Sequence, residues 1–211
     1  MNTRQIFMLA LPIFAAACFG VQRGATALMS NPQPNEARRA EPPDSPATTS
    51  QAPLKLPLVN PKIFVSKSQR RLELYSDGRI VRTYRVGLGL SPVEDKVKQG
   101  DHRTPEGEFY VCVKNAHSKF YLSLGLSYPN TEDAARGLRD GLITKAQHEQ
   151  IVSAIKRGKR PPWDTALGGE IFIHGHGSQT DWTWGCVALE NTEMKELFDA
   201  VPLGTPVTIK R

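Results

Sequence analysis

The stretch that decides the fold is IFIHGHGSQTDWTWGCVALEN, residues 171–191. The apolar run 171–173 predicts a short buried strand, and a second apolar run, 187–189, closes the stretch. A polar loop rich in Gly and Trp joins the two runs. His174 and Cys186 stand at opposite ends of this loop, each beside an apolar segment. A Cys/His nucleophile pair needs such flanks, because the imidazole and the thiol must be held within hydrogen-bond reach.

These residue types predict a thiol active site. Cys186 is the predicted nucleophile, because a neighbouring imidazole can convert a thiol to the reactive thiolate. His174 is the predicted base, which donates and accepts the proton, and the backbone carbonyl of Gly175 is predicted to orient its ring. The backbone N–H groups of Trp184, Gly185 and Cys186 are predicted to form an oxyanion hole. Gly185 also removes side-chain bulk beside the sulfur.

Other interpretations of the same residues stay open. A buried cysteine and a histidine at a strand end often have structural roles only. His174, His176 and Cys186 are all metal-ligand types, but no second ligand pair at zinc-like spacing accompanies them. We therefore predict neither a metal nor a cofactor. His176 is predicted to be a loop or substrate-contact residue.

Composition places the chain among soluble globular proteins. It has 211 residues, of which 39% are hydrophobic and 23% charged, with a formal net charge of +6. A mildly basic protein suits acidic partners such as nucleic acid, anionic lipid or an acidic polymer. Because the charges are scattered, with no basic stripe interleaved with aromatic residues, we predict no nucleic-acid binding.

The first 29 residues have the pattern of a secretory signal. Arg4 gives a positive start, and the apolar run 6–19 has signal-peptide length. Ala15-Ala16-Ala17-Cys18 resembles a lipoprotein processing site, which would make Cys18 a lipid anchor and the only link to a membrane. Residues 25–27 would instead suit ordinary cleavage, and an uncleaved anchor helix is a further alternative. We expect a protein of the periplasm or cell envelope.

Residues 30–60 predict a disordered tether, because they are rich in Pro, Ser and Thr and contain few large apolar groups. The folded domain is then predicted to span residues 61–211. A tether would let this domain reach a substrate away from its anchor.

Short alternating patterns predict a β-rich domain. Asp77-Gly78 is a hairpin turn signal between two of the expected strands. The predicted strands are residues 63–65, 72–75, 80–88, 109–113 and 207–209. Cys112 falls on the opposite face of its strand from the core residues, and we interpret it as a small packed residue rather than a disulfide partner of Cys186.

Helix signals occur in two places. Asn130 or Thr131 can cap a helix that runs to residue 139, and Thr144 with Gln147 forms a capping box for a second helix before Gly158. His148 lies in this second helix and is interpreted as a packing residue. A third helix is predicted after the cysteine, with Asn191 as its cap and an apolar face of Met194, Leu197, Phe198 and Val201. The predicted class is mainly β with a helical insertion.

Several motifs together resemble the L,D-transpeptidase catalytic-domain family (YkuD type), which remodels bacterial peptidoglycan. The resemblance runs from about Lys62 to Ile209, and the family implies a β-sandwich or barrel-like fold. The residues that carry the resemblance are Ile173-His174-Gly175, Gly185-Cys186-Val187, Gly87-Leu88-Gly89, the segment 103–109 with its Thr-Pro-Glu-Gly element, and the segments 120–124 and 128–130.

The chain departs from the family pattern at two positions. Many members read Ser/Thr-His-Gly-Cys, whereas Trp184 replaces that second histidine here. Ala188 stands where many members carry Arg or Asn. The Tyr-Pro-Asn segment and the Gly-Cys-Val-Ala pattern are similar to the subgroup that includes murein peptide hydrolases acting on wall-linked lipoprotein. The acyl acceptor, an amine or water, therefore stays open.

The resemblance implies that Cys186 attacks the meso-diaminopimelate carbonyl of a peptidoglycan stem peptide, with His174 taking the thiol proton. A second stem's amine would then resolve the acyl-enzyme. Arg103, Tyr121 and Ser123 are weaker candidates for substrate contacts. The alternatives are an amidase that releases a wall-linked lipoprotein and, from another class, a non-catalytic peptidoglycan-binding module.

Overall fold

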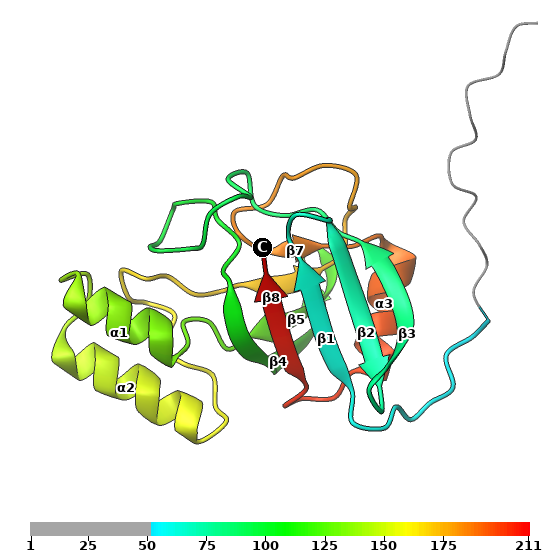
Figure 1. Cartoon of the computed structure of the whole chain (residues 1–211), viewed down its shortest axis with the longest axis horizontal. Helices are drawn as coiled ribbons and strands as arrows, with labels where there is room; N and C mark the ends of the chain where they lie inside the picture. Colours follow the sequence, from blue (N-terminus) through cyan, green and yellow to red (C-terminus); the bar gives the residue numbers. More distant parts are fainter. Residues whose placement is uncertain (1–51) are drawn as a thin grey trace, which may run out of the picture. The chain divides into compact units, whose positions relative to one another are not determined.

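The computed structural model describes residues 52–211 (Figure 1). The predicted signal, the Cys18 anchor and most of the predicted tether lie outside these residues. The strands are β1 Lys62–Ser66, β2 Arg71–Ser76, β3 Arg79–Arg85, β4 Gly107–Ser118, β5 Tyr121–Leu126, β6 Phe172–His174, β7 Val187–Ala188 and β8 Pro206–Lys210. The helices are α1 Thr131–Arg139, α2 Lys145–Lys156 and α3 Asn191–Ala200.

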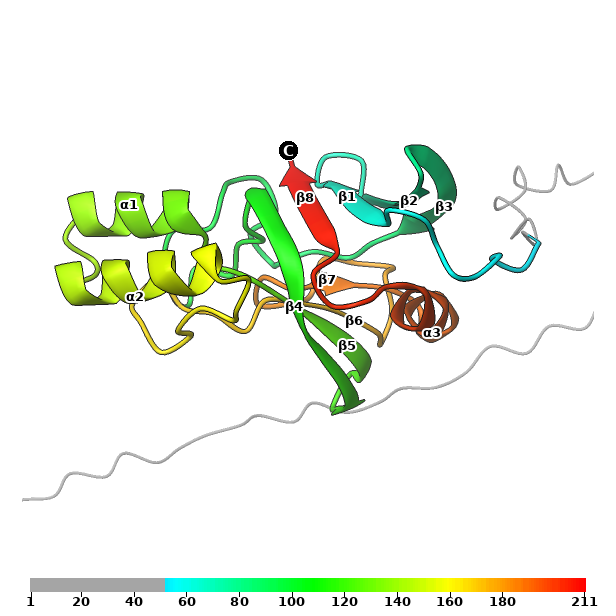
Figure 2. The same cartoon turned by 90° about the horizontal axis from the view of Figure 1, so that it is seen from below.

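All eight strands form a single sheet in the order β3-β2-β1-β8-β4-β5-β6-β7. The pairs β1–β8 and β6–β7 are parallel, and the other neighbours are antiparallel. The long strand β4 pairs with β8 near its start and with β5 further along, and its direction changes between the two pairings (Figure 2). A register shift between Val111 and Val113 leaves Cys112 unpaired at this bend.

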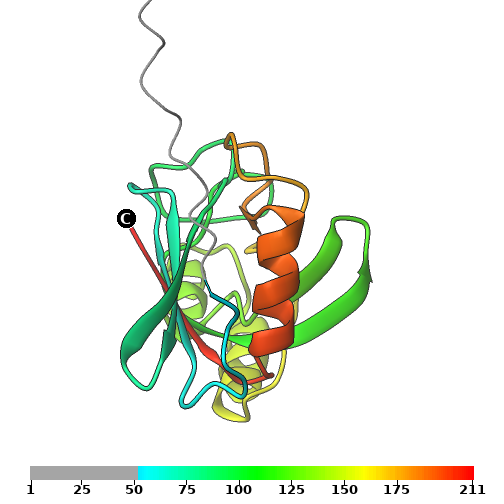
Figure 3. The ribbon, with the colours of Figure 1, turned by 90° about the vertical axis from the view of Figure 1, so that its right-hand side faces the viewer.

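Helix α3 lies inside the curl of the sheet, between β1–β3 on one side and the β4–β5 hairpin on the other (Figure 3). Its face with Met194 and Leu197 is fully buried in the main core. Glu196 of α3 accepts hydrogen bonds from Arg82 and from the hydroxyl of Tyr84, both on β3. Lys114 of β4 donates to the carbonyl groups of Phe198 and Val201 at the C-terminal end of the helix. Both sides of the curled sheet are thereby fastened to one helix.

The helical insertion α1–α2 packs on a small core of its own, which includes Ile143, Ile151 and Leu167. The predicted caps of α1 and α2 are confirmed. Asn130 accepts from the N–H groups of Glu132 and Asp133. Thr144 forms the capping box of α2. The half-buried His148 lies on this insertion.

The third cap prediction is wrong. The N-cap of α3 is Glu190, and Asn191 is the first helical residue. The Asn191 side chain instead accepts a hydrogen bond from the N–H of His176 at 2.9 Å. Asn191 therefore holds the loop that follows His174 rather than the helix end, and this partner is distant in sequence.

Two strand predictions also differ from the structure. The return strand ends at Arg85 rather than 88, because the chain then crosses to the segment around Cys186, where Gly87 forms an isolated bridge with Ala188 of β7 and Gly89 one with Thr183. Strand β5 was not predicted, although Leu122, Leu124 and Leu126 alternate with smaller residues and give a strand signal. The predicted class, mainly β with a helical insertion and a helix after the cysteine, is confirmed.

Candidate active site

Parallel pairing of β6 and β7 brings the two ends of the loop together. His174 is the last residue of β6, and Cys186 immediately precedes β7. The register pairs Ile173 with Val187 and His174 with Ala188. His174 and Cys186 consequently line one cavity of about 510 Å³. This is the juxtaposition that a nucleophile and its base require.

The imidazole of His174 is fixed on several sides. Its side chain is buried, at 3% exposure. Nδ1 lies 2.7 Å from the carbonyl oxygen of Gly175. The ring stacks on Phe120 with centroids 4.7 Å apart and meets Trp182 edge-on at 5.5 Å. The bond to Gly175 fixes the tautomer that carries hydrogen on Nδ1, so Nε2 is the nitrogen left to accept a proton.

Burial lowers the pKa of His174 below its ordinary value, the Gly175 carbonyl raises it in part, and the nearby His176 lowers it further. The ring is therefore neutral at pH 7 and can act as a base.

The thiol of Cys186 is held differently. Its Sγ lies 3.6 Å from the carbonyl oxygen of Glu170, to which it donates, and accepts from the N–H of Phe172 at 3.4 Å. Burial raises the pKa of the thiol to about 11, although the Phe172 N–H and Lys96 act in the opposite direction. The structure shows no hydrogen bond from Sγ to His174 within residues 52–211. In this arrangement the thiol points at the Glu170 carbonyl rather than at the imidazole.

A backbone turn places the nucleophile. Gly185 has φ of +124°, and a Cβ there would lie 2.6 Å from the carbonyl oxygen of Arg103. Only glycine fits this turn. Gly185 is therefore needed for the backbone conformation as well as for the predicted access to the sulfur. Thr183 Oγ1 donates to the Cys186 carbonyl and accepts from the Gly185 N–H. Because that N–H is already used, Trp184 and Cys186 provide the remaining candidate oxyanion donors.

Ion pairs and hydrogen bonds hold the rest of the loop. Asp181 accepts from Arg70 at 2.6 Å and from the N–H of Leu88 at 2.9 Å. Glu190 accepts from the N–H and the hydroxyl of Ser178, at 2.9 and 3.1 Å. The Ser178 N–H is the main cause that holds the pKa of the Glu190 carboxyl below its ordinary value. The loop thus has fixed points on either side of the turn.

Two buried ammonium groups hold the facing loop, residues 90–106: Lys96 lies within it, and Lys67 reaches it from the turn after β1. Lys96 contacts Asp101 at 2.7 Å and lines the cavity. Lys67 contacts Glu106 at 2.7 Å and donates to the Thr104 carbonyl. The Thr-Pro-Glu-Gly element therefore has a structural role here, as the binding site for a buried lysine.

The four weaker candidates do not line this cavity. Arg103 forms an ion pair with Glu94 and points its carbonyl at Gly185. Tyr121 is exposed at the start of β5, and Ser123 is buried opposite His174 in the sheet. His176 lies beyond Trp182, in a shallower hollow, with its ring edge-on to Phe120.

Sequence reasoning assigned no role to several cavity residues. They are Lys96, Gln99, Gly100, His102, Phe120, Gly169, Glu170, Ile171, Trp182 and Thr183. Phe120 begins the segment 120–124 that carries the family resemblance, and Trp182 lies inside the opening stretch, so both aromatic residues were within reach of sequence analysis. The loop 96–102 gave no such signal, because it reaches the cavity only through the fold.

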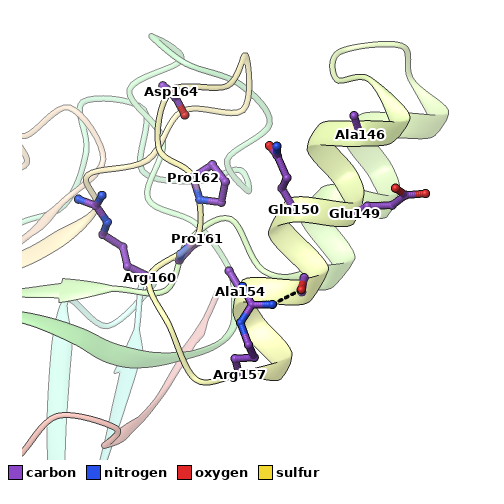
Figure 4. A pocket seen from close by; sticks show the side chains of 10 residues that line it. Ala146, Glu149, Gln150, Ala154, Arg157, Arg160, Pro161, Pro162 and Asp164 are labelled. Atoms are coloured by element: carbon purple, nitrogen blue, oxygen red, sulfur yellow. Dashed lines mark hydrogen bonds between the residues drawn. The ribbon is translucent and has the colours of Figure 1, made fainter.

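A wider groove lies on the helical insertion, between α2 and residues 160–164 (Figure 4). Its volume is about 790 Å³, and its charged residues balance, with Arg157 and Arg160 against Glu149 and Asp164. It contains no cysteine or histidine and so cannot perform thiol chemistry. Residues 52–211 contain no group of three or more His, Cys, Asp or Glu side chains that could hold a metal ion. Nor is any helix in this range long and apolar enough to cross a membrane.

Known proteins share this domain. The chain is 24% identical over 150 residues to a Bacillus subtilis (strain 168) protein named "Putative L,D-transpeptidase YqjB", a match covering 71% of each chain. Among solved structures, it is similar to a K307A mutant of the helical cell shape determining protein Pgp2 from Campylobacter jejuni, with 24% identity and a TM-score of 0.49. That match covers 72% of this chain but only 47% of the Pgp2 chain, so the chain spans about half of that protein.

An L,D-transpeptidase from Xylanimonas cellulosilytica is similar with 17% identity and a TM-score of 0.43, over 75% of this chain and 64% of the other. The YkuD family profile, the L,D-transpeptidase catalytic domain, matches residues 60–209 and includes every residue of the cavity. The chain therefore belongs to the L,D-transpeptidase catalytic-domain family.

Proposed function

We propose that the protein is a peptidoglycan L,D-transpeptidase that works through a thioester on Cys186, with His174 as the base. The observation that carries this proposal is the cavity that a firmly packed imidazole and a thiol line together. Membership of the family supports stem peptides of peptidoglycan as the substrate class.

The first half-reaction begins when Sγ turns from the Glu170 carbonyl toward His174. The imidazole takes the thiol proton as sulfur attacks the carbonyl of the meso-diaminopimelate residue. A C–S bond forms, the peptide bond to the terminal residue breaks, and His174 returns the proton to the departing amine. We assign the stabilisation of the oxyanion of the intermediate to the N–H groups of Trp184 and Cys186.

The second half-reaction consumes the thioester. His174 takes a proton from the incoming amine of a second stem, nitrogen displaces sulfur, and the thiol is regenerated with a new crosslink. Water in place of the amine gives a hydrolysed stem, or the release of a wall-linked lipoprotein. We propose the amine as the acyl acceptor. We also propose the periplasm or cell envelope as the location of the protein, because peptidoglycan is found there.

The test is incubation of the protein with tetrapeptide stems, followed by chromatographic separation of dimers and shortened monomers. Cys186→Ala should lower the rate by at least about a thousandfold. Cys112→Ala is the matched control, because it removes the other free thiol of residues 52–211 and lies outside the cavity. Full activity of Cys186→Ala would contradict the proposal. Shortened monomers without dimers would assign the hydrolase instead.

A further inference from the structure

Trp184 is the most exposed large apolar side chain of residues 52–211, at 77% exposure. It lies two residues before the nucleophile and lines the same cavity. An apolar ring left in water beside a reactive group is a typical mark of a binding surface. None of the catalytic steps above uses this ring.

The ring is held in a fixed orientation. Trp184 stacks on His102 with centroids 5.5 Å apart and planes 9° from parallel. The His102 backbone has φ of +56°, and its carbonyl accepts the N–H of Ser91 at 3.1 Å. The next carbonyl, that of Arg103, packs against Gly185. Close contact between the two loops thus builds a flat surface, the Trp184–His102 platform.

The surroundings of the platform decide which ligand fits. Phe120 and Trp182, the other aromatic side chains of the cavity, contact the His174 ring, whereas the platform presents an open aromatic face. Gln99 lines the cavity with His102 and supplies an amide. A pyranose ring matches this arrangement, because its C–H face packs on an aromatic ring while hydroxyl and acetamido groups at its edge bond to an amide or imidazole.

The length of a stem peptide agrees with a sugar at this place. Three extended residues span about 10 Å. A stem peptide whose carbonyl reaches Cys186 therefore holds its sugar within a short distance of that residue, and Trp184 and His102 line the same cavity of about 510 Å³.

We propose that the Trp184–His102 platform binds the amino-sugar ring to which the stem peptide is attached, so that glycan-linked stems are preferred over free peptides. The proposal rests on the proposed function for the reaction itself. The binding of a sugar is separable from it and is tested separately.

The kinetic test compares kcat/KM for a disaccharide-tetrapeptide with that for the free tetrapeptide. Trp184→Ala should reduce this ratio about tenfold, mainly through KM of the sugar-bearing substrate, whereas Trp184→Phe should preserve it. Leu203→Ala is the matched control, because Leu203 is 60% exposed and outside the cavity. The ratio cancels any effect of the substitution on the oxyanion donors. An unchanged ratio in Trp184→Ala would overturn the proposal.

The binding test needs no turnover. The disaccharide without peptide is titrated into Cys186→Ala protein, and the indole N–H signals are followed by NMR. The proposal predicts a saturable shift of one indole signal, which is assigned to Trp184 by its absence from the Trp184→Phe variant. Calorimetry should show that the disaccharide still binds to Trp184→Phe and no longer binds to Trp184→Ala. Failure of the disaccharide to bind overturns the platform, whereas binding by a protein that leaves stems intact overturns only the proposed reaction.

Discussion

The two sides of the active-site cavity are built by different means. On one side, His174 is held by side-chain packing between Phe120 and Trp182 and by one carbonyl. On the other, Cys186 is placed by a backbone turn that only Gly185 can form, with its thiol on the Glu170 carbonyl. The proposed base is thus fixed by packing, whereas the proposed nucleophile would have to rotate to reach it. Each prediction below changes one side and leaves the other.

The largest effect is expected from removal of the base. His174→Gln should lower kcat by about a thousandfold or more, because it removes the imidazole that is proposed to take the thiol proton. Steady-state crosslinking of tetrapeptide stems measures the loss. His176→Gln is the control, since His176 lies in the neighbouring hollow. Equal losses of kcat in the two variants would show that His174 is not the base.

The raised thiol pKa gives the next largest effect. With a pKa of about 11, the thiolate fraction of Cys186 increases about tenfold per pH unit, so alkylation by iodoacetamide should accelerate about a hundredfold from pH 7 to 9. The experiment uses Cys112→Ser protein, because burial also raises the pKa of Cys112 to about 11. A rate that is already constant below pH 8 would indicate a preformed thiolate–imidazolium pair.

The turn at Gly185 is expected to show a smaller effect, on stability. Gly185→Ala should reduce the free energy of unfolding by about 2–3 kcal/mol, because it adds a clash with the Arg103 carbonyl to the strain of positive φ. Gly204→Ala is the control, because Gly204 also has positive φ but a Cβ there would meet no neighbouring atom. It measures the backbone strain alone, which should lower the free energy of unfolding by about 1 kcal/mol. Urea denaturation compares the two. Similar losses of unfolding free energy in the two variants would show that the loop at Arg103 moves to relieve the clash.

The smallest effect concerns the packing of the base. Phe120→Ala removes the ring stacked on His174 and should lower kcat about tenfold with little change in KM. Phe120→Tyr keeps the stack and should retain the wild-type rate. A loss confined to KM would show that Phe120 binds substrate rather than positioning the imidazole.

Local signals in the sequence predicted much of the fold. Asp77-Gly78 forms the expected hairpin turn, and Asn130 and Thr144 cap their helices, because each signal depends on neighbours within a few residues. The closeness of the chain segments that carry His174 and Cys186 was equally predictable, since β6 and β7 flank one loop. Asn191 was wrongly predicted as a helix cap, because its side-chain oxygen accepts a hydrogen bond from the N–H of His176, which is distant in sequence.

The rest of the site depends on contacts between distant segments. The stack of His102 on Trp184 requires two loops about eighty residues apart to pack closely. The contact of the thiol with Glu170 requires φ of +56° at that residue, which its side chain does not predict. Arg103 was predicted to contact substrate, whereas its ion pair with Glu94 in the same loop holds the side chain outside the cavity.

The central claim, a thioester formed by Cys186 with His174 as its base, is tested most directly by intact-mass spectrometry. The protein is mixed with a tetrapeptide stem, stopped with acid within seconds, and compared with the Cys186→Ala and His174→Gln variants. The account predicts an added acyl mass that peptide mapping locates on Cys186, absent from Cys186→Ala and slow to form in His174→Gln. Turnover of the stem with no acyl mass, or an adduct on another residue, would contradict it.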